Sequence, residues 1–371
     1  MDPVPIVLRG SLHNEADSTI IRADKSSNSQ GTDGLGSLKL SEQPVPELGD
    51  NQVLVKRNAA VQGASLNFRD LVVSRGQYPF GSKDNVIPGS DGAGIVMAVG
   101  KHVTRFAPGD KVVTMLLPGH IAGPPTATNT SRQLGATTDG TFRTFGAFDE
   151  QGLVRMPEGL SFTEAATLSC AGVTAWNALF GGGRPLSAGQ WLLTEGTGGV
   201  SLFAVQFAKA IGARVISTTS SAEKAEMLRK LGAEHVVNYR ETLAWGEEAK
   251  RLTGGVGVDL VVDVTGPSGL EQSVKSLRLD GTVAVVGAIA GFEGDAKVPT
   301  LLDTWVSLFT SRGLWVGNRL QMEDMCRAIE GNVERLRPVL DSKVFKLDRL
   351  KEAYEYMESG KFSGKICIEI S

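Results

Sequence analysis

The chain has 371 residues, a formal net charge of −3 and 21% charged residues, so no basic surface for nucleic acid or anionic membranes is expected. No apolar run is long enough to span a bilayer, and the polar N-terminus lacks a signal-peptide core. Its length suggests two domains, and three separate cysteines favour reduced thiols and a cytoplasmic location.

The first part of the chain is expected to form short β-strands. Residues 52–56 have a strand-like pattern, and residues 87–97 and 106–113 hold apolar stretches broken by glycine and proline. Closely spaced turns of this kind indicate a compact, mostly β domain. Residues 26–36 are polar and glycine-rich and are predicted to form a surface loop. A longer irregular loop is predicted at residues 116–138, where a lid or pocket wall can lie.

Three phenylalanines follow that long loop. They are compatible with an apolar pocket, but we favour a place in the core for Phe142, Phe145 and Phe148.

A glycine-dense turn is the most informative segment of the chain. Residues 191–201 combine an apolar strand, a glycine-rich turn and the start of a helix with periodic apolar positions. Such a turn lets backbone N–H groups approach a phosphate, and the helix N-terminus adds partial positive charge. A tight strand–helix connection without a ligand is the alternative. The residues expected to hold a dinucleotide pyrophosphate are Gly196, Thr197, Gly198, Gly199 and Val200.

Strands and helices alternate after this turn. Further strands are predicted at residues 213–218, 234–238, 258–264 and 282–287, and a helix is predicted at residues 222–231. This alternation indicates a parallel sheet covered on both faces, the doubly wound (Rossmann) α/β arrangement of dinucleotide-binding domains. The glycine turn then lies at the carboxyl end of the first strand, as that fold requires.

The end of the second strand favours NADP(H) over NAD. An NAD site usually has an acidic residue about 20 positions beyond the glycines, and here Thr219 stands in that region. Hydroxyl groups and cations suit a 2′-phosphate instead. The candidates are Ser220, Ser221, Lys224, Tyr239 and Arg240. For Lys224, an ordinary solvated helix lysine is the alternative.

The C-terminal part is predicted to contain helices near residues 322–332 and 347–359 and a strand at residues 365–370. We expect this strand to pair back into the N-terminal β domain, so that the nucleotide domain is inserted within the other. The predicted division is a catalytic domain of residues 1–160, completed by 320–371, and a nucleotide-binding domain of residues 161–319.

Several motifs occur together and in order: Asn-Phe-Arg-Asp at 67–70, Arg-Gly-Gln-Tyr-Pro at 75–79, the glycine-rich run at 88–94, the turn at 196–200, Leu-Gly-Ala-Glu-His at 231–235 and Gly-Lys at 364–365. With these, the chain resembles the medium-chain dehydrogenase/reductase superfamily along nearly its whole length. It looks closest to the zinc-free branch of quinone oxidoreductases and enoyl reductases. The resemblance implies a GroES-like β catalytic domain beside the Rossmann domain, oxidoreductase activity and a homodimer.

No metal is expected. Zinc-dependent members of the superfamily carry a cysteine where this chain has Asn67, and Gly-His-Glu where it has residues 89–91. Their separate structural zinc site needs four closely spaced cysteines, and residues 94–150 of this chain contain no cysteine. Zinc requires three or four suitable ligands. The four histidines do not pair at ligand spacing and are expected on the surface or in loops: His13, His102, His120 and His235.

Without zinc, hydrogen-bond donors must polarise a substrate carbonyl. The resemblance implies that Asn67 lies beside the nicotinamide and that Tyr78 acts as a proton donor or substrate anchor. A phenol with a pKa of about 10 stays protonated at neutral pH and can donate to an enolate. The alternatives are a loop-capping role for Asn67 and packing of Tyr78 against Pro79 and Phe80 at a turn.

Other positions follow from the resemblance alone. It places Thr174, Gly287 and Asn318, the last within residues 315–318, around the nicotinamide. Ser201 replaces the usual glycine at the end of the phosphate turn, which is tolerable if its side chain points along the helix.

These observations predict an NADPH-dependent, zinc-independent oxidoreductase that transfers hydride to an α,β-unsaturated carbonyl compound or a quinone, with Tyr78 or water returning the proton. Two alternatives stay open: a metal-free carbonyl or alcohol oxidoreductase on the same scaffold, and an NADPH-binding protein without turnover. The substrate is a small molecule that the sequence does not identify, although the lack of a clear basic site disfavours a coenzyme A thioester.

Overall fold

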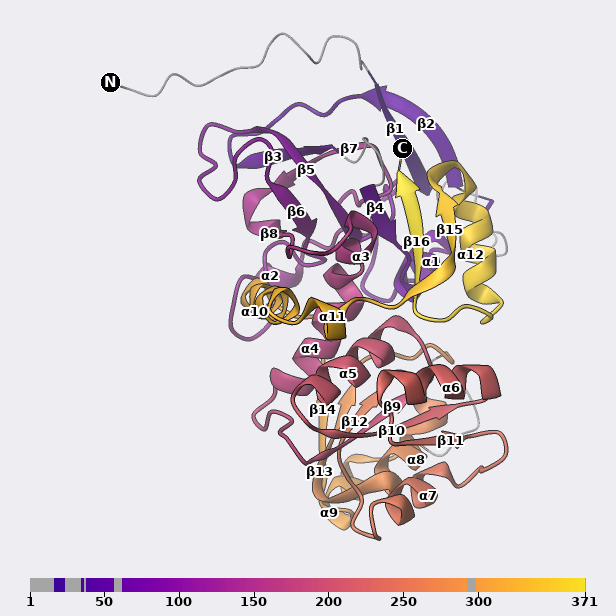
Figure 1. Ribbon diagram of the computed structural model, residues 1–371. Coiled ribbons are helices and arrows are strands. Elements are labelled where there is room, and N and C mark those ends of the chain that lie inside the picture. Colours follow the sequence, from indigo (N-terminus) through magenta and orange to yellow (C-terminus); the bar gives the residue numbers. More distant parts are fainter. Residues whose placement is uncertain (1–16, 24–34, 37, 57–61, 292–297, 371) are drawn as a thin grey trace.

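The computed structural model describes residues 17–23, 35–36, 38–56, 62–291 and 298–370. Figure 1 shows two bodies, one above the other. The upper body contains the N-terminal strands together with the C-terminal strand, and the lower body contains the strands between residues 191 and 313. The chain enters the lower body once and returns once, so the lower body is an insertion within the upper one.

The lower body is built on a six-stranded parallel sheet in the order β11-β10-β9-β12-β13-β14. Its central strands β9, β10 and β12 are largely buried because helices cover both faces, whereas the edge strand β14 is mostly exposed. The strand order reverses between β9 and β12, which is where doubly wound folds bind their ligands. The predicted Rossmann fold is confirmed. The strands are β9 (Trp191–Glu195), β10 (Arg214–Thr219), β11 (His235–Asn238), β12 (Val258–Asp263), β13 (Leu277–Val285) and β14 (Thr310–Gly313).

Helices connect these strands, and local signals explain their ends. The helix predicted at residues 222–231 has those bounds, since Ser221 caps its N-terminus and Gly232 ends it with a φ of 109°. Strand β13 begins five residues before the prediction because Leu277 pairs with Val258. The helices are α4 (Val173–Phe180), α5 (Gly199–Ala210), α6 (Ala222–Leu231), α7 (Trp245–Leu252), α8 (Pro267–Ser276) and α9 (Leu301–Val306).

The upper body contains an eight-stranded sheet whose longest path is β15-β16-β4-β5-β3-β7, with β6 and β8 attached through β5. The C-terminal strand pairs antiparallel with β4 and places Cys367 opposite Ser65, which confirms its predicted return to the N-terminal domain. Strands β1 (Asp17–Ala23) and β2 (Leu38–Pro44) form a separate pair. The sheet strands are β3 (Gln52–Lys56), β4 (Gln62–Ser65), β5 (Asp91–Val99), β6 (Lys111–Thr114), β7 (Phe145–Asp149), β8 (Leu153–Arg155), β15 (Leu340–Lys346) and β16 (Lys365–Ile370).

The loops of the upper body agree with the expectations that can be checked. Residues 116–138 are irregular apart from the four-residue helix α2 (Ala127–Thr130). The phenylalanines at 142, 145 and 148 are at most 5% exposed, which confirms their place in the core. The loop predicted at residues 26–36 lies almost entirely outside the described residues. The remaining helical segments are α1 (Phe68–Ser74), η2 (Glu150–Gly152), α3 (Phe162–Ala166), η3 (Leu168–Gly172), α10 (Arg319–Glu330), α11 (Val333–Leu336), η4 (Leu347–Arg349) and α12 (Leu350–Glu358).

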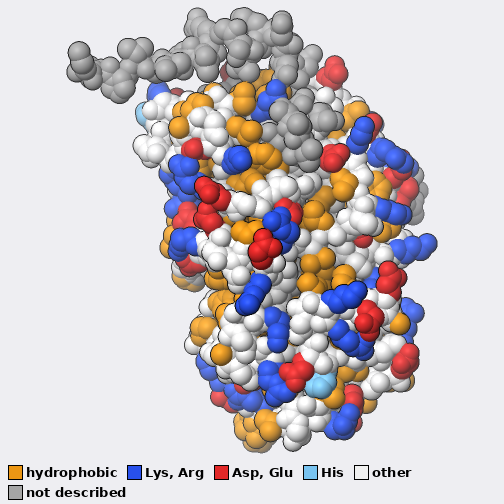
Figure 2. Space-filling model, in the orientation of Figure 1, with side chains coloured by type: hydrophobic (Ala, Val, Ile, Leu, Met, Phe, Trp, Pro, Cys, Tyr) orange, Lys and Arg blue, Asp and Glu red, His pale blue; other side chains and the backbone are white. Residues whose placement is uncertain are grey.

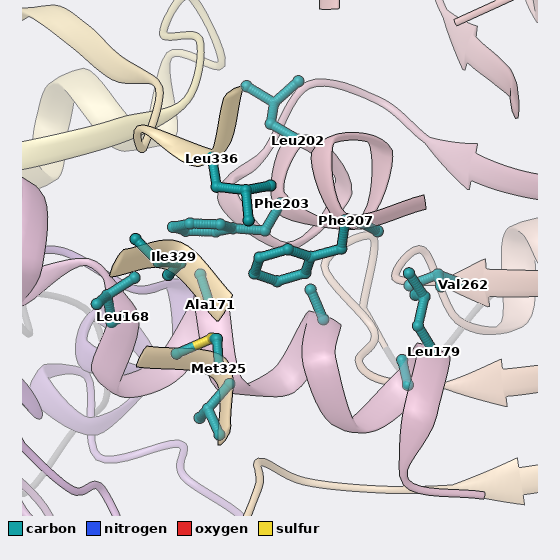
Figure 3. Packing of buried hydrophobic residues seen from close by; sticks show 14 of the residues in the cluster. Leu168, Ala171, Leu179, Leu202, Phe203, Phe207, Val262, Met325, Ile329 and Leu336 are labelled. Carbon is teal, nitrogen blue, oxygen red and sulfur yellow. The ribbon is translucent and has the colours of Figure 1, made fainter. Parts of the chain in front are cut away.

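One hydrophobic core joins the two bodies (Figure 3). The rings of Phe203 and Phe207 on α5 stack at 5.7 Å and belong to the same buried cluster as Met325 on α10 and Leu336 on α11. Leu168 on η3 extends this cluster toward the upper body. Helix α5 carries the glycine turn at its start, so this packing fixes the turn against the C-terminal part of the chain.

The surface gives no sign of a large single-sign patch on the face in Figure 2, where cationic and anionic side chains are interspersed over both bodies. Among the helices that the structure describes, none is long and apolar enough to cross a membrane.

Candidate functional site

The glycine turn has open space on its outer side. Gly196 has a φ of 71°, and a Cβ atom added to Gly196 or Gly198 would meet nothing within 4 Å. On the inner side, a Cβ on Gly199 would lie 2.5 Å from Lys365 Cδ and 3.0 Å from Ala171 Cβ. The turn is therefore closely packed behind and free in front, at the start of a twelve-residue helix. This arrangement fits the pyrophosphate of a dinucleotide.

The side chain of Ser201 bonds within the turn. Its side chain is 1% exposed, and its hydroxyl donates to the carbonyl oxygen of Glu195 at 2.6 Å. The hydroxyl is thus satisfied within the turn and ties the first turn of α5 to the end of β9.

Lys224, proposed for the 2′-phosphate, is not an ordinary solvated lysine. Its Nζ donates to the carbonyl oxygens of Gly360 at 2.9 Å and Phe362 at 2.8 Å. An ammonium group has three protons, so these two bonds leave one donor for a further acceptor. The backbone N–H of Lys224 donates to the Ser221 hydroxyl oxygen, which caps α6. The C-terminal segment therefore holds this cation at the carboxyl end of β10.

The other residues proposed for the 2′-phosphate also lie near the carboxyl ends of the strands. Thr219 ends β10 and is 3% exposed, while Tyr239 and Arg240 follow β11 and are exposed. Ser220, between β10 and α6, is half-buried. No carboxylate takes the position of Thr219.

A buried lysine organises the region around Asn67. Lys365 begins β16 and is 3% exposed. Its Nζ donates to the carbonyl oxygen of Leu66 at 2.6 Å, to Asn67 Oδ1 at 2.6 Å and to Asp91 Oδ2 at 3.1 Å. Sequence reasoning noted Lys365 only as part of a motif and did not predict this role.

Asp91 is fully buried and accepts several hydrogen bonds. Besides Lys365, the hydroxyl of Ser65 donates to its Oδ2 at 2.6 Å and the hydroxyl of Ser90 to its Oδ1 at 3.1 Å. The carboxylate is thereby balanced by one cation and two hydroxyl groups, as a buried charge requires. We define the group formed by Ser65, Asn67, Ser90, Asp91 and Lys365 as the Lys365 cluster.

Asn67 stands at the N-cap position of α1, as its structural alternative expected. Its backbone N–H donates to Asp70 Oδ2 at 2.9 Å, and burial raises the pKa of Asp70 to about 6. The side-chain Oδ1 is held by Lys365, and Nδ2 lies 3.4 Å from Ser90 Oγ. The residue therefore combines a capping position with an amide group whose orientation is fixed.

Tyr78 lies in an aromatic and polar environment. Its hydroxyl donates to Gln133 Oε1 at 2.8 Å. Its ring meets Phe80 edge-on at 5.3 Å, as the packing alternative expected, and the Arg69 guanidinium lies 5.0 Å from the ring centre. Phe80 in turn contacts Trp315 at 4.5 Å, so an aromatic row connects Tyr78 to the segment after β14.

The structure brings together other predicted positions. The hydroxyl of Thr174 donates to the carbonyl oxygen of Trp315 at 3.3 Å, and Asn318 caps α10 by accepting from the backbone N–H of Gln321. Gly287 follows β13 and lies beside Val264, which follows β12. Helix α4 and residues 315–318 are therefore neighbours, and Asn318 has a structural function as the cap of α10.

The donor set does not fit a zinc ion. The described part of the chain contains no group of three or more His, Cys, Asp or Glu side chains that could hold a metal. The Lys365 ammonium already compensates Asp91, and burial raises the pKa of the Cys170 thiol to about 12. His120 is buried but bonds to the loop carbonyl of Gly123.

The remaining histidines give no ligand set. His102 is exposed, and His235 stacks on Trp191. His13 lies outside the described residues.

Glu195 is a second buried acid that sequence reasoning missed. Its Oε2 accepts from the backbone N–H groups of Val264 and Thr265, and its Oε1 accepts from Ser273, whose hydroxyl also contacts Asp263. Burial, and then the charge of Asp263, raise the pKa of Glu195 to about 7. The available signal was an acidic residue ending an apolar strand directly before the glycine turn.

The sequence is similar to known alcohol dehydrogenase-like proteins. A family model described as alcohol dehydrogenase GroES-like domain matches residues 49–158, and one described as zinc-binding dehydrogenase matches residues 199–331. A zinc-type alcohol dehydrogenase-like protein of Schizosaccharomyces pombe is 42% identical over 340 residues, which cover 91% of this chain and 96% of that protein.

Two solved structures are similar over nearly their full lengths. A putative alcohol dehydrogenase from Sinorhizobium meliloti has a TM-score of 0.83 and 36% identity, covering 95% of this chain and 99% of that one. A structure described as an NAD-dependent alcohol dehydrogenase has a TM-score of 0.81 and 30% identity, covering 95% of this chain and 100% of that one.

Proposed function

We propose a specific activity for this chain, which belongs to the medium-chain dehydrogenase/reductase superfamily of alcohol dehydrogenase-like oxidoreductases, enzymes that use a nicotinamide cofactor. The proposed activity is the NADPH-dependent, zinc-independent reduction of α,β-unsaturated carbonyl compounds or quinones. The single observation that carries this proposal is the Lys365 cluster: a buried ammonium and carboxylate beside Asn67, where a metal would need anionic ligands.

The cluster supports hydrogen-bond polarisation of the substrate. The bound cofactor would supply a hydride. The Asn67 amide offers one N–H donor, because Lys365 occupies its carbonyl oxygen and the other N–H is directed at Ser90. Reduction of a conjugated C=C bond moves negative charge onto the carbonyl oxygen, and a fixed donor at that oxygen stabilises the transition state. A neutral amide suits this reaction because the double bond is already electron-poor.

Tyr78 is the proposed proton donor. Its hydroxyl donates to Gln133, and the Arg69 guanidinium lies over its ring, so the phenol has a fixed orientation. Transfer of the hydroxyl proton to the substrate enolate would leave a phenolate, which water reprotonates. The aromatic neighbours Phe80 and Trp315 are about half exposed and provide an apolar wall for the substrate.

Lys224 and its neighbours support the choice of NADPH. Lys224 is held at the carboxyl end of β10 with one proton left for a phosphate, beside the hydroxyls of Ser220 and Ser221. One similar structure is described as NAD-dependent, so the two cofactors must be compared directly.

A metal-free alcohol or carbonyl oxidoreductase is the second candidate, favoured by the alcohol dehydrogenase names of the relatives. An NADPH-binding protein without turnover is the third. Stopped-flow oxidation of bound NADPH or NADH against enones, quinones, aldehydes and ketones separates the three. Faster oxidation of NADPH by enones or quinones is the expected result. Oxidation by aldehydes alone would establish the second candidate, and tight NADPH binding without oxidation by any acceptor would establish the third.

We also propose a homodimer. Strand β14 is an edge of the parallel sheet, and helix α9, which precedes it in the chain, has no buried residue. Leu301 is 90% exposed and Trp305 73% exposed, values that suit contact with a second copy. Light scattering should give twice the chain mass, and a Trp305→Glu variant should shift the protein toward the monomer. A wild-type monomer at working concentrations would contradict this.

A further inference from the structure

The Lys365 cluster also connects the proposed substrate donor to the cofactor turn. The aliphatic part of Lys365 packs so closely behind Gly199 that a Cβ there would lie 2.5 Å from Cδ. The preceding residue, Gly364, donates its backbone N–H to the carbonyl oxygen of Thr197 at 2.9 Å and forms a parallel bridge with Gly198. Two adjacent residues thus contact both the phosphate turn and Asn67.

The chemistry of the ammonium fixes the Asn67 amide. A lysine Nζ has three protons and no acceptor site. All three have partners: the carbonyl oxygen of Leu66, Asn67 Oδ1 and Asp91 Oδ2. Lys365 therefore has no proton left for a substrate, and the amide oxygen of Asn67 must face it. The NH2 group of Asn67 is consequently turned away from Lys365.

We propose that Lys365 is a positioning residue: it holds the Asn67 amide so that the N–H not directed at Ser90 faces the substrate oxygen and, through Gly364, it sets that donor in register with the cofactor turn. This inference rests on the proposed function and adds to it that Lys365 acts on the reaction through Asn67. It differs from a purely structural ion pair in one respect: the effect of Lys365 on the rate must pass through Asn67.

A double-mutant cycle tests this difference. Asn67→Ala removes the donor, Lys365→Met removes the ammonium but keeps the length of the side chain, and the third variant combines them. Loss of one such donor lowers kcat by about 100-fold. We expect Asn67→Ala to show a loss of this size, Lys365→Met a loss of about tenfold or more, and the double variant no further loss beyond Asn67→Ala. Losses that multiply in the double variant would overturn the inference.

Cofactor affinity and folding are measured on the same variants. We expect the Kd for NADPH, measured by fluorescence without any acceptor, to change less than about threefold in Lys365→Met, because the pyrophosphate contacts are made by the turn. A large rise in this Kd with kcat unchanged would assign Lys365 to cofactor binding and overturn the inference. Lys351→Met, an exposed lysine on α12, is the control and should behave as wild type.

Removal of Lys365 alone leaves Asp91 buried without its cation, and this variant is at risk of unfolding. Asp91→Asn/Lys365→Met removes both charges together and should fold, as judged by a single thermal transition. We expect the same loss of kcat in this pair, whereas wild-type kcat in the folded pair would overturn the inference. If the wild-type protein binds NADPH but does not oxidise it with any of the acceptors, the proposed function itself is overturned, and this inference with it.

Discussion

Lys365 Nζ lies 3.1 Å from Asp91 Oδ2, and the two side chains are 4% and 0% exposed. The pair joins the C-terminal strand β16 to the start of β5, 274 residues away in sequence. Neither charge can be solvated in this position, so each depends on the other and on the hydroxyls of Ser65 and Ser90.

Breaking this pair should therefore be costly. Asp91→Ala leaves the Lys365 ammonium buried and unpaired, and we expect a loss of about 3–5 kcal/mol in the free energy of unfolding, measured with urea. Glu234→Ala, which breaks the exposed pair with Arg214, is the matched control and should lose at most about 1 kcal/mol. Equal losses of unfolding free energy in the two variants would show that the buried pair contributes no more to stability than the exposed pair.

Gly199 and Gly198 should respond differently to alanine. A Cβ on Gly199 would collide with Lys365 and Ala171, so Gly199→Ala should lower the melting temperature by several degrees. Gly198 has a φ of −73° and open space, so Gly198→Ala should fold normally but weaken NADPH binding by crowding the phosphate. Thermal unfolding and fluorescence titration measure the two effects. Unchanged NADPH affinity in Gly198→Ala would contradict the assignment of the turn.

Lys224→Ala should discriminate between the two cofactors. A hydrogen bond to a charged group contributes about 1.5–3 kcal/mol, so KM for NADPH should rise about tenfold or more while KM for NADH changes little. The variant also removes the bonds to Gly360 and Phe362. Its melting temperature is therefore measured as well, and an equal rise in both KM values would remove Lys224 from the phosphate site.

Tyr78→Phe keeps the ring contacts with Phe80 and Arg69 but removes the hydroxyl that bonds Gln133. General acid catalysis contributes about 100-fold or more, so kcat should fall by that order while the Kd for NADPH stays the same. Steady-state kinetics with an enone measures the change. Wild-type kcat in this variant would reduce Tyr78 to a packing residue.

Glu195 should make stability depend on pH. Its pKa is raised from 4.5 to about 7 in the folded protein, so the folded state binds more protons than the unfolded state between these values. Stability should consequently fall as the pH rises from about 4.5 through 7. Glu195→Gln removes the ionisation while keeping an acceptor for Thr265. It should be more stable than wild type by on the order of 1–3 kcal/mol at pH 8, with little difference near pH 5, as measured by denaturant unfolding at both pH values.

Local signals in the sequence predicted the nucleotide-binding sheet and its helices well. The apolar strand at 191–195, the glycine turn and the cap residues of α6 each act within a few positions of one another, so a single chain segment contains the whole signal. Strand β13 was predicted too short because Asp280 and Gly281 interrupt its apolar pattern, whereas pairing of Leu277 with β12 extends it.

The candidate site was predicted less completely because its contacts are distant in sequence. Asn67 and Tyr78 were expected as donors, but the residue that holds the Asn67 amide lies 298 positions away. Lys224 was expected to be either a phosphate ligand or a solvated lysine, and its bonds to residues 360 and 362 depend on how the C-terminal segment folds back. The pairing of β16 with β4 within the upper body brings Lys365 to Asn67, and the packing of the two bodies brings residues 360 and 362 to Lys224.

The most direct test of the central claim is the rate of NADPH oxidation by an enone, measured on purified protein before and after dialysis against a zinc chelator, together with its zinc content. We predict no stoichiometric zinc and the same rate in both samples, since Asn67 and Tyr78 rather than a metal would polarise and protonate the substrate. One zinc ion per chain, with the rate lost on chelation and restored by added zinc, would contradict the account.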